Sequence, residues 1–134
     1  MYALADSAQA MDFIDLVMYR DCPGTLAILM EDNALPGVCV AVDGGDHPDA
    51  VFSVCVCVTE VLKRNPQIAG VVLASVRPHD SPDCDDIDRW FELVHDFEQL
   101  GVELLEWFVV GPAFAVGMRA ITGCVSAWET ASDQ

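Results

Sequence analysis

Residues 68–76 read Ile-Ala-Gly-Val-Val-Leu-Ala-Ser-Val, an almost continuous apolar run. A strand that is apolar on both sides is covered on both sides, so this segment is predicted to lie in the interior of a sheet. It is followed by a polar loop, Arg77–Pro82, and by Asp83–Leu100, where apolar residues recur at helical spacing. A buried strand that leads through a loop into an amphipathic helix is typical of an α/β fold.

The neighbouring segments alternate between helical and strand patterns. Asp49–Arg64 is rich in Val, which favours a strand, but its length and its 3.6-residue apolar stripe favour a helix, and we predict a helix. Val38–Val42 is apolar at every position, so we expect both of its faces to be covered, by helices or by a partner chain. The other predicted elements are a helix over Ser7–Asp21 and strands over Thr25–Met30, Val102–Val110 and Ala113–Met118.

This order predicts a single α/β domain with a mixed β-sheet flanked by helices. We divide the chain into an N-terminal helix (1–22), the α/β domain proper (23–122) and a tail (123–134), for which Trp128 is the candidate anchor. The side chains expected in the core are Phe13, Val40, Val58, Val72, Trp90, Phe91, Val94 and Leu104.

Charge excludes two classes of partner. The chain has 134 residues, with 6 basic and 22 acidic side chains and a formal net charge of −16. Such a chain repels the phosphates of nucleic acids and the surface of an anionic membrane. No stretch resembles a signal peptide or is long enough to span a membrane, so we expect a cytoplasmic protein. The cysteines form no C-x-x-C pair and are expected to be reduced and structural; they are Cys22, Cys39, Cys55, Cys57, Cys84 and Cys124.

Reactive side chains concentrate between Val71 and Asp88, where a buried strand passes through a loop into a helix. Such loops often carry binding or catalytic groups. The candidates are His79, Asp80, Asp83, Cys84, Asp85 and Asp86. Carboxylates in this position also suit the first turn of a helix, where they satisfy free N–H groups without a further function. His79 and the charged face around Asp88 and Arg89 are expected to be solvated, and His47, in a Gly/Asp loop, and His95, on the polar side of the helix, are weaker candidates.

Residues Val71–Gly111 resemble the RadC-like branch of the JAB/MPN/JAMM family, whose fold is of the cytidine-deaminase-like kind. That branch shows a buried strand, an H-x-H-P loop, a helix entry with Asp-Ile, and a strand that begins Gly-Ile-x-Leu-Leu. The matching residues here are Pro78, Asp86-Ile87 and Gly101-Val102-Glu103-Leu104-Leu105. The resemblance implies a JAB/MPN architecture for this chain.

The resemblance also implies a zinc site, with ligands from H-x-H and a later Asp and with a general-base Glu at the start of an early strand. Here the H-x-H positions are Ser75 and Arg77, and the Glu position is Gly24. Only the Asp has a match, Asp86, or Asp85 if the alignment shifts by one. Serine is a poor zinc ligand and an arginine cation repels the metal. We therefore predict no bound zinc, and an ion pair from Arg77 to Asp86, Asp85 or Asp83.

These observations lead to the hypothesis of a non-catalytic RadC-like JAB/MPN domain, an interaction or scaffold module without a cofactor. Its expected partner is another protein or a second copy of itself. One alternative is a metal-dependent hydrolase that holds zinc through a rebuilt site, formed by His79, Asp83, Cys84 and Asp86. A second alternative, suggested by the net charge, is an acidic protein that binds a basic partner.

Overall fold

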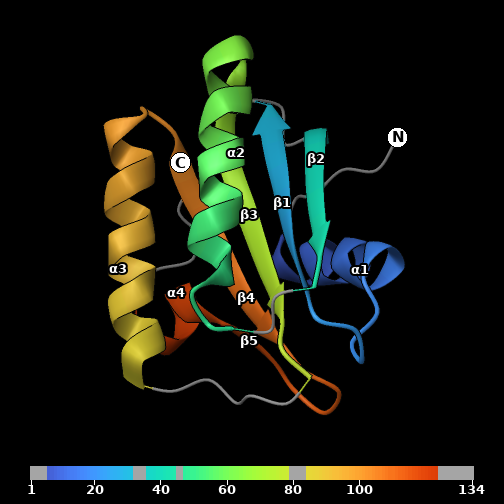
Figure 1. The fold of residues 1–134 in the computed structure, drawn as a ribbon. Coiled ribbons are helices and arrows are strands. Elements are labelled where there is room, and N and C mark those ends of the chain that lie inside the picture. Colours follow the sequence, from blue (N-terminus) through green and yellow to red (C-terminus); the bar gives the residue numbers. More distant parts are fainter. Residues whose placement is uncertain (1–5, 32–35, 45–46, 79–83, 124–134) are drawn as a thin grey trace.

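A five-stranded sheet with the strand order β2-β1-β3-β4-β5 forms the centre of the computed structural model, which describes residues 6–31, 36–44, 47–78 and 84–123 (Figure 1). The strands are β1 (Gly24–Glu31), β2 (Pro36–Asp43), β3 (Ile68–Val76), β4 (Glu103–Val110) and β5 (Ala115–Gly117). Strand β1 is antiparallel to both β2 and β3, β3 is parallel to β4, and β5 is antiparallel to β4. The predicted class, a single α/β domain with a mixed sheet, is therefore confirmed.

Strand β3 is the middle strand of the sheet, as its sequence predicts. All of its residues except Ala69 are buried. Its side chains enter two separate apolar clusters, one on each face of the sheet: Leu73 belongs to the first and Val72 to the second. Burial on both faces explains why the run is apolar at consecutive positions and does not alternate.

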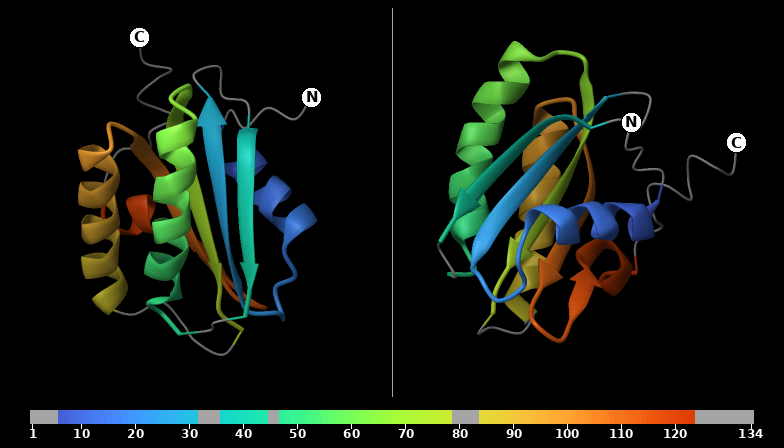
Figure 2. Two further views of the ribbon diagram at one scale, coloured as in Figure 1. Left: turned by 45° about the horizontal axis from the view of Figure 1, so that its top comes forward. Right: turned by 90° about the vertical axis from the view of Figure 1, so that its right-hand side faces the viewer.

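The helices cover both faces of this sheet (Figure 2). Helices α2 (Ala50–Arg64) and α3 (Cys84–Gln99) pack on one face, where Val54 and Leu93 join the first cluster. Helix α1 (Ser7–Val17) packs on the other face, where Ile14 joins the second cluster. None of the helices in the described part of the chain is both long and apolar enough to cross a membrane.

Local signals set the helix ends. The Asp6 carboxylate accepts a hydrogen bond from the Gln9 N–H at the start of α1 (2.8 Å). Gly101, at φ +73°, follows α3 in the left-handed conformation that glycine adopts without strain. The helix predicted over Ser7–Asp21 ends earlier, at Val17, because Met18 turns to extended backbone and places its side chain in the core.

Part of the predicted core is wrong. Val58, Val72, Trp90 and Leu104 are buried, but the Phe91 side chain is 53% exposed. The buried stripe of α3 runs through Trp90, Leu93 and Phe97, and the residue after Trp90 points about 100° away from it. The remaining predicted core residues, Phe13, Val40 and Val94, are half-buried at the margins of the two clusters.

Among the described residues, helices do not cover both faces of strand β2, so that part of the prediction is wrong, and cover by a partner chain stays a prediction. Strand β2 is an edge strand, and its residues alternate between half-buried and exposed from Pro36 to Ala41. The strand predicted over Ala113–Met118 is also shorter than expected. It ends at Gly117, and Met118 begins a short helix, α4 (Met118–Ile121), because its side chain is buried in the first cluster.

Candidate ion-pair site

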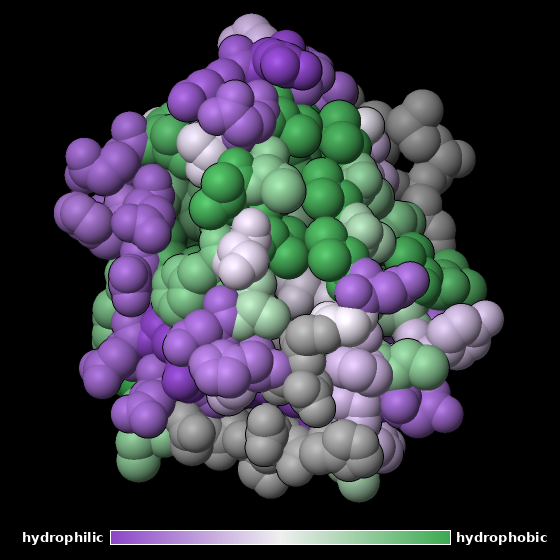
Figure 3. All heavy atoms as spheres, in the orientation of Figure 1, coloured by the Kyte–Doolittle hydropathy of each residue, from purple (hydrophilic) through white to green (hydrophobic). Residues whose placement is uncertain are grey.

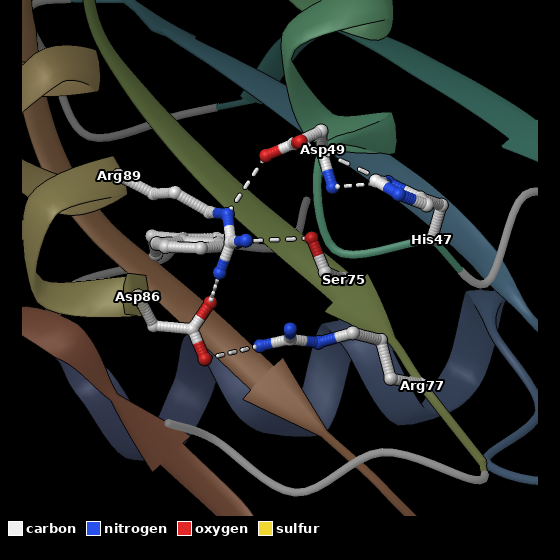
Figure 4. Close-up of polar contacts among 7 residues, drawn as sticks. His47, Asp49, Ser75, Arg77, Asp86 and Arg89 are labelled. Atoms are coloured by element: carbon white, nitrogen blue, oxygen red, sulfur yellow. Dashed lines mark hydrogen bonds and ion pairs between the residues drawn. The ribbon is translucent and has the colours of Figure 1, made fainter. Parts of the chain in front are cut away.

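Charged side chains from three segments meet at the carboxyl end of β3 (Figure 4). Asp49 precedes α2, Ser75 and Arg77 lie at the end of β3, and Asp86 and Arg89 lie in the first turns of α3. Strands β3 and β4 are parallel and α3 connects them, so the site lies where ligands usually bind in α/β sheets. The fold therefore brings the residues of the resemblance to the expected edge.

Asp86 is the centre of the cluster. Its Oδ2 accepts a hydrogen bond from Arg77 Nη2 at 2.8 Å, and its Oδ1 accepts one from Arg89 Nη1 at 2.9 Å. The Asp86 side chain is fully buried and that of Arg77 is 2% exposed. The predicted contact between Arg77 and the first turn of the helix is thus confirmed, with Asp86 as the partner.

Ser75 and Arg77 both contact the side chain of Trp107 of β4. The Trp107 indole N–H donates to Ser75 Oγ at 2.9 Å, and the Arg77 guanidinium lies 5.9 Å from the centre of the Trp107 ring. Arg77 Nε and Nη1 are buried and have no hydrogen-bond partner among the described residues. The ring face compensates in part, because a cation is attracted to the π-electrons of an indole.

Arg89 extends the cluster to the start of α2. Its Nε donates to Asp49 Oδ1 at 2.8 Å, and its side chain is only 15% exposed. The hydrogen bond from Arg89 lowers the pKa of the Asp49 carboxyl below its usual value. Arg89 was expected to be solvated on the acidic face of α3, and this expectation is wrong because Asp86 and Asp49 draw the guanidinium inward.

Gly24 lies at the same edge of the sheet but faces the other way. It is paired with Val76, and a Cβ built on it would lie 2.8 Å from Met18 Cε of the α1 layer. Opposed residues of a sheet share a face, so Thr25, which is paired with Ser75, is the β1 residue on the side of the cluster. A carboxylate at position 24 would therefore point away from Ser75 and Arg77.

The other predicted ligands are dispersed or outside the described residues. His79, Asp80 and Asp83 lie outside them, whereas Cys84, Asp85 and His95 are described and exposed. Within the described ranges, no group of three or more His, Cys, Asp or Glu side chains is arranged to hold a metal ion. His47 is exposed, and its Nδ1 accepts the Asp49 backbone N–H at 3.1 Å.

The five described cysteines are free thiols, and Cys124 lies outside the described residues. Cys22, Cys39, Cys57 and Cys84 are exposed. Cys55 is half-buried, and burial raises the pKa of its thiol to about 12. Cys39 is exposed on the edge strand β2, and Cys57 is exposed because it lies outside the buried stripe of α2.

A second buried polar network joins β4 to α4 and was missed at the sequence level. Glu106 Oε1 accepts the backbone N–H groups of Trp107 (3.0 Å) and Arg119 (2.7 Å). The Arg119 side chain donates to the carbonyl oxygens of Leu104 and Leu105 and stacks on the Trp90 ring at 5.4 Å. Burial raises the pKa of the Glu106 carboxyl. The sequence signal for this network is Glu106, a charged residue within the apolar run of β4.

No protein-family model matches this chain, and no curated protein matches it either.

Proposed function

We propose that this chain is a non-catalytic domain of the RadC-like JAB/MPN type, which works through contacts with protein and not through a metal-activated water. The observation that carries this proposal is the state of Asp86. Both of its carboxylate oxygens accept hydrogen bonds from arginine side chains, at 2.8 and 2.9 Å. Each oxygen is held by an arginine cation, so a metal ion bound to this carboxylate would stand beside two positive charges.

The remaining positions of the resemblance do not fit zinc either. Zinc in a hydrolase needs neutral imidazole or carboxylate ligands, an open position for water and a nearby base. The Ser75 hydroxyl already accepts the Trp107 indole N–H, and Arg77 brings a fixed positive charge to the second ligand position. Gly24 faces the α1 layer. The residues present therefore do not suit the metal that the resemblance implies.

The charges of the cluster balance without a metal. Arg77 and Arg89 contribute two positive charges, and Asp49 and Asp86 contribute two negative charges. The buried ion pair takes the structural place that a metal would have, because it joins the end of β3 to the start of α3. This supports a domain in which the end of β3 stays joined to the start of α3 without metal chemistry.

Metal content tests the proposal. We expect the purified protein, dialysed without chelator, to contain far less than one zinc per chain by elemental analysis. We also expect added zinc to leave the thermal midpoint of the protein unchanged. Asp86→Asn and Asp88→Asn form a matched pair, because both are acidic residues of α3 and Asp88 is exposed.

Stoichiometric zinc that survives dialysis and is lost in Asp86→Asn but not in Asp88→Asn would contradict the proposal. That result would favour the rebuilt hydrolase, with ligands from His79, Asp83, Cys84 and Asp86. Zinc lost equally in both variants, or retained in both, would place a metal elsewhere and contradict the absence of a cofactor.

A further inference from the structure

Among the described residues, strand β2 is paired with β1 alone, and the protection of its other edge lies at its two ends, with Pro36 and a register shift beside it at one end and Asp43 at the other. Its segment Pro36–Val42 carries no charged residue, and no proline interrupts it after Pro36. Natural edge strands are usually shielded by charges, prolines or bulges, because open N–H and C=O groups pair readily with another strand. The β2 edge therefore has the features of a pairing surface.

The backbone groups that face outward can be identified from the ladder. The Gly44 N–H donates to the Pro23 carbonyl at 2.9 Å, continuing the pairing of β2 with β1. Inward and outward groups alternate along an antiparallel strand, so Val38, Val40 and Val42 bond toward β1. The N–H and C=O groups of Cys39, Ala41 and Asp43 then point away from the sheet, whereas Gly37 lies at the register shift between Pro36 and Val38 and is outside this alternation.

Apolar surface flanks this edge on both faces of the sheet. On the α2 face, the side of the helix toward β2 carries Ser53, Cys57 and Val61, which are uncharged and exposed or half-buried. Figure 3 shows the apolar area that α2 and β2 present together.

On the α1 face, the end of the helix extends past β2 (Figure 1) and carries Leu16 and Tyr19, which are 74% and 77% exposed. A hollow lined by Val17, Tyr19, Asp43 and Gly44 places this helix end beside the end of β2.

Charge indicates what binds there. The chain carries −16, and the exposed side of α3 carries acidic residues from Asp85 to Glu98. Two copies therefore repel each other across most of their surfaces. Neither Pro36–Val42 nor the first part of α2, 50–59, carries a charge, so this face allows a second copy to approach. Strand β2 has one carboxylate, Asp43 at its end, so it offers little negative charge to a basic partner.

We propose that the β2 edge binds a second copy of this chain, with the two β2 strands antiparallel about a two-fold axis at Val40. This inference rests on the proposed function, since it names the partner of the interaction module. Cys39 then exchanges both backbone hydrogen bonds with Ala41 of the second copy. Ala41 does so with Cys39 of the second copy, and Asp43 lies opposite Gly37 and not opposite a like charge. The two sheets, five strands each, become continuous.

The first experiment measures mass in solution by light scattering or sedimentation. We expect the wild-type protein to be a dimer at micromolar concentration. Ala41→Asp adds a charge to the β2 edge and should give a monomer whose circular dichroism spectrum matches the wild type. Ala115→Asp is the matched control, because Ala115 is exposed on β5 at the opposite edge of the sheet, and it should remain a dimer.

Three results would overturn the proposal: a wild-type monomer, a dimer that persists in Ala41→Asp, or a dimer that is lost equally in Ala115→Asp. The failure of this inference is distinct from that of the proposed function. A monomer without zinc contradicts only the dimer, whereas a dimer with stoichiometric zinc contradicts only the non-catalytic domain.

The second experiment tests the register by disulfide trapping in a Cys39→Ser background. Val40 faces itself across the proposed axis as a non-hydrogen-bonded pair, with Cα atoms about 4.5 Å apart, which is within disulfide range. Val40→Cys should give a covalent dimer on mild oxidation. Val38→Cys is the control, because it would lie opposite Val42 of the second copy and should remain at the background level. Trapping through Val38→Cys and not through Val40→Cys would contradict the register.

Discussion

Asp86 has a fully buried carboxylate that is held by Arg77 and Arg89. The net stability that such a buried ion pair contributes is often close to zero, because the removal of both charges from water offsets their attraction. The pair therefore serves to fix the geometry between β3 and α3. Removal of only one partner is a different matter, because it leaves an uncompensated buried charge.

We expect Asp86→Ala to lower the free energy of unfolding by about 3–5 kcal/mol, because the buried Arg77 guanidinium loses its counter-ion. The exposed Asp88→Ala on the same helix should change it by less than about 0.5 kcal/mol. The double variant Arg77→Met/Asp86→Leu should be more stable than Asp86→Ala. Urea denaturation measures all three. Equal stabilities of Asp86→Ala and Asp88→Ala would show that Arg77 does not depend on Asp86.

Asp49 makes the cluster sensitive to acid. Its folded-state pKa is lowered from 3.8 by the hydrogen bond from Arg89, so this carboxylate adds stability above pH 3.8. That contribution is lost as the pH falls through the lowered folded-state pKa. Asp49→Asn should therefore be slightly less stable than the wild type at neutral pH, and the two should converge below pH 3.8. Urea denaturation at a series of pH values checks this, and a constant difference down to acid pH would contradict it.

At the scale of the elements, α3 has a narrow apolar stripe, and its side chains differ sharply in burial. Phe97 is 2% exposed and packs against the sheet, whereas Phe91 is 53% exposed. Strand β3 has no exposed side, because its side chains are buried on both faces of the sheet. Val72, for example, is completely inaccessible to solvent. Stability should therefore depend on β3 at every position and on α3 only along one side.

The same substitution at two positions of α3 tests this. Phe97→Ala should cost about 3–5 kcal/mol of unfolding free energy, because it opens a cavity under the helix. Phe91→Ala should cost less than about 1 kcal/mol, because little apolar surface is uncovered. Val72→Ala, in the middle of β3, should cost ~2 kcal/mol or more. Thermal or urea unfolding gives the comparison, and a large loss for Phe91→Ala would mean that α3 is rotated about its axis.

The whole molecule carries −16, and this charge opposes compaction. The exposed side of α3 carries several acidic residues, while the ion pairs of Asp86 are buried. Salt screens exposed charges far more than buried pairs, since the Debye length falls from about 30 Å at 0.01 M to about 8 Å at 0.15 M. Screening should therefore relieve repulsion and leave the cluster intact.

We accordingly expect the thermal midpoint of the protein to rise when sodium chloride is increased from low to physiological concentration. Scanning calorimetry across a salt series measures the effect. The same series on Asp86→Ala should show a rise of similar size, because the missing pair is a buried one. A midpoint that falls with salt would show that attractive surface pairs outweigh the net repulsion.

The local patterns of the sequence determined the elements and one contact between them. The apolar run of 68–76 predicted the interior strand, and the 3.6-residue stripe of 49–64 predicted a helix despite its valines. The pairing of Arg77 with Asp86 was also predictable, because a cation after a buried strand needs an anion and the nearest ones lie in the first turn of the next helix. The apolar period of a segment and the need of a buried cation for a nearby anion both depend on residues that are close together in the sequence.

Only the tertiary structure decided which segments meet. Asp49 and Arg89 are 40 residues apart, and no sequence pattern joins them. The apolar run of β2 required cover, but its place at the edge of the sheet depends on the order in which strands pair. Gly24 was assigned to the right edge of the sheet and yet faces the wrong layer, because a shift of one residue reverses the face of a side chain. Strand order and register arise from the packing of the whole sheet against its helices, and a single segment of sequence does not contain that information.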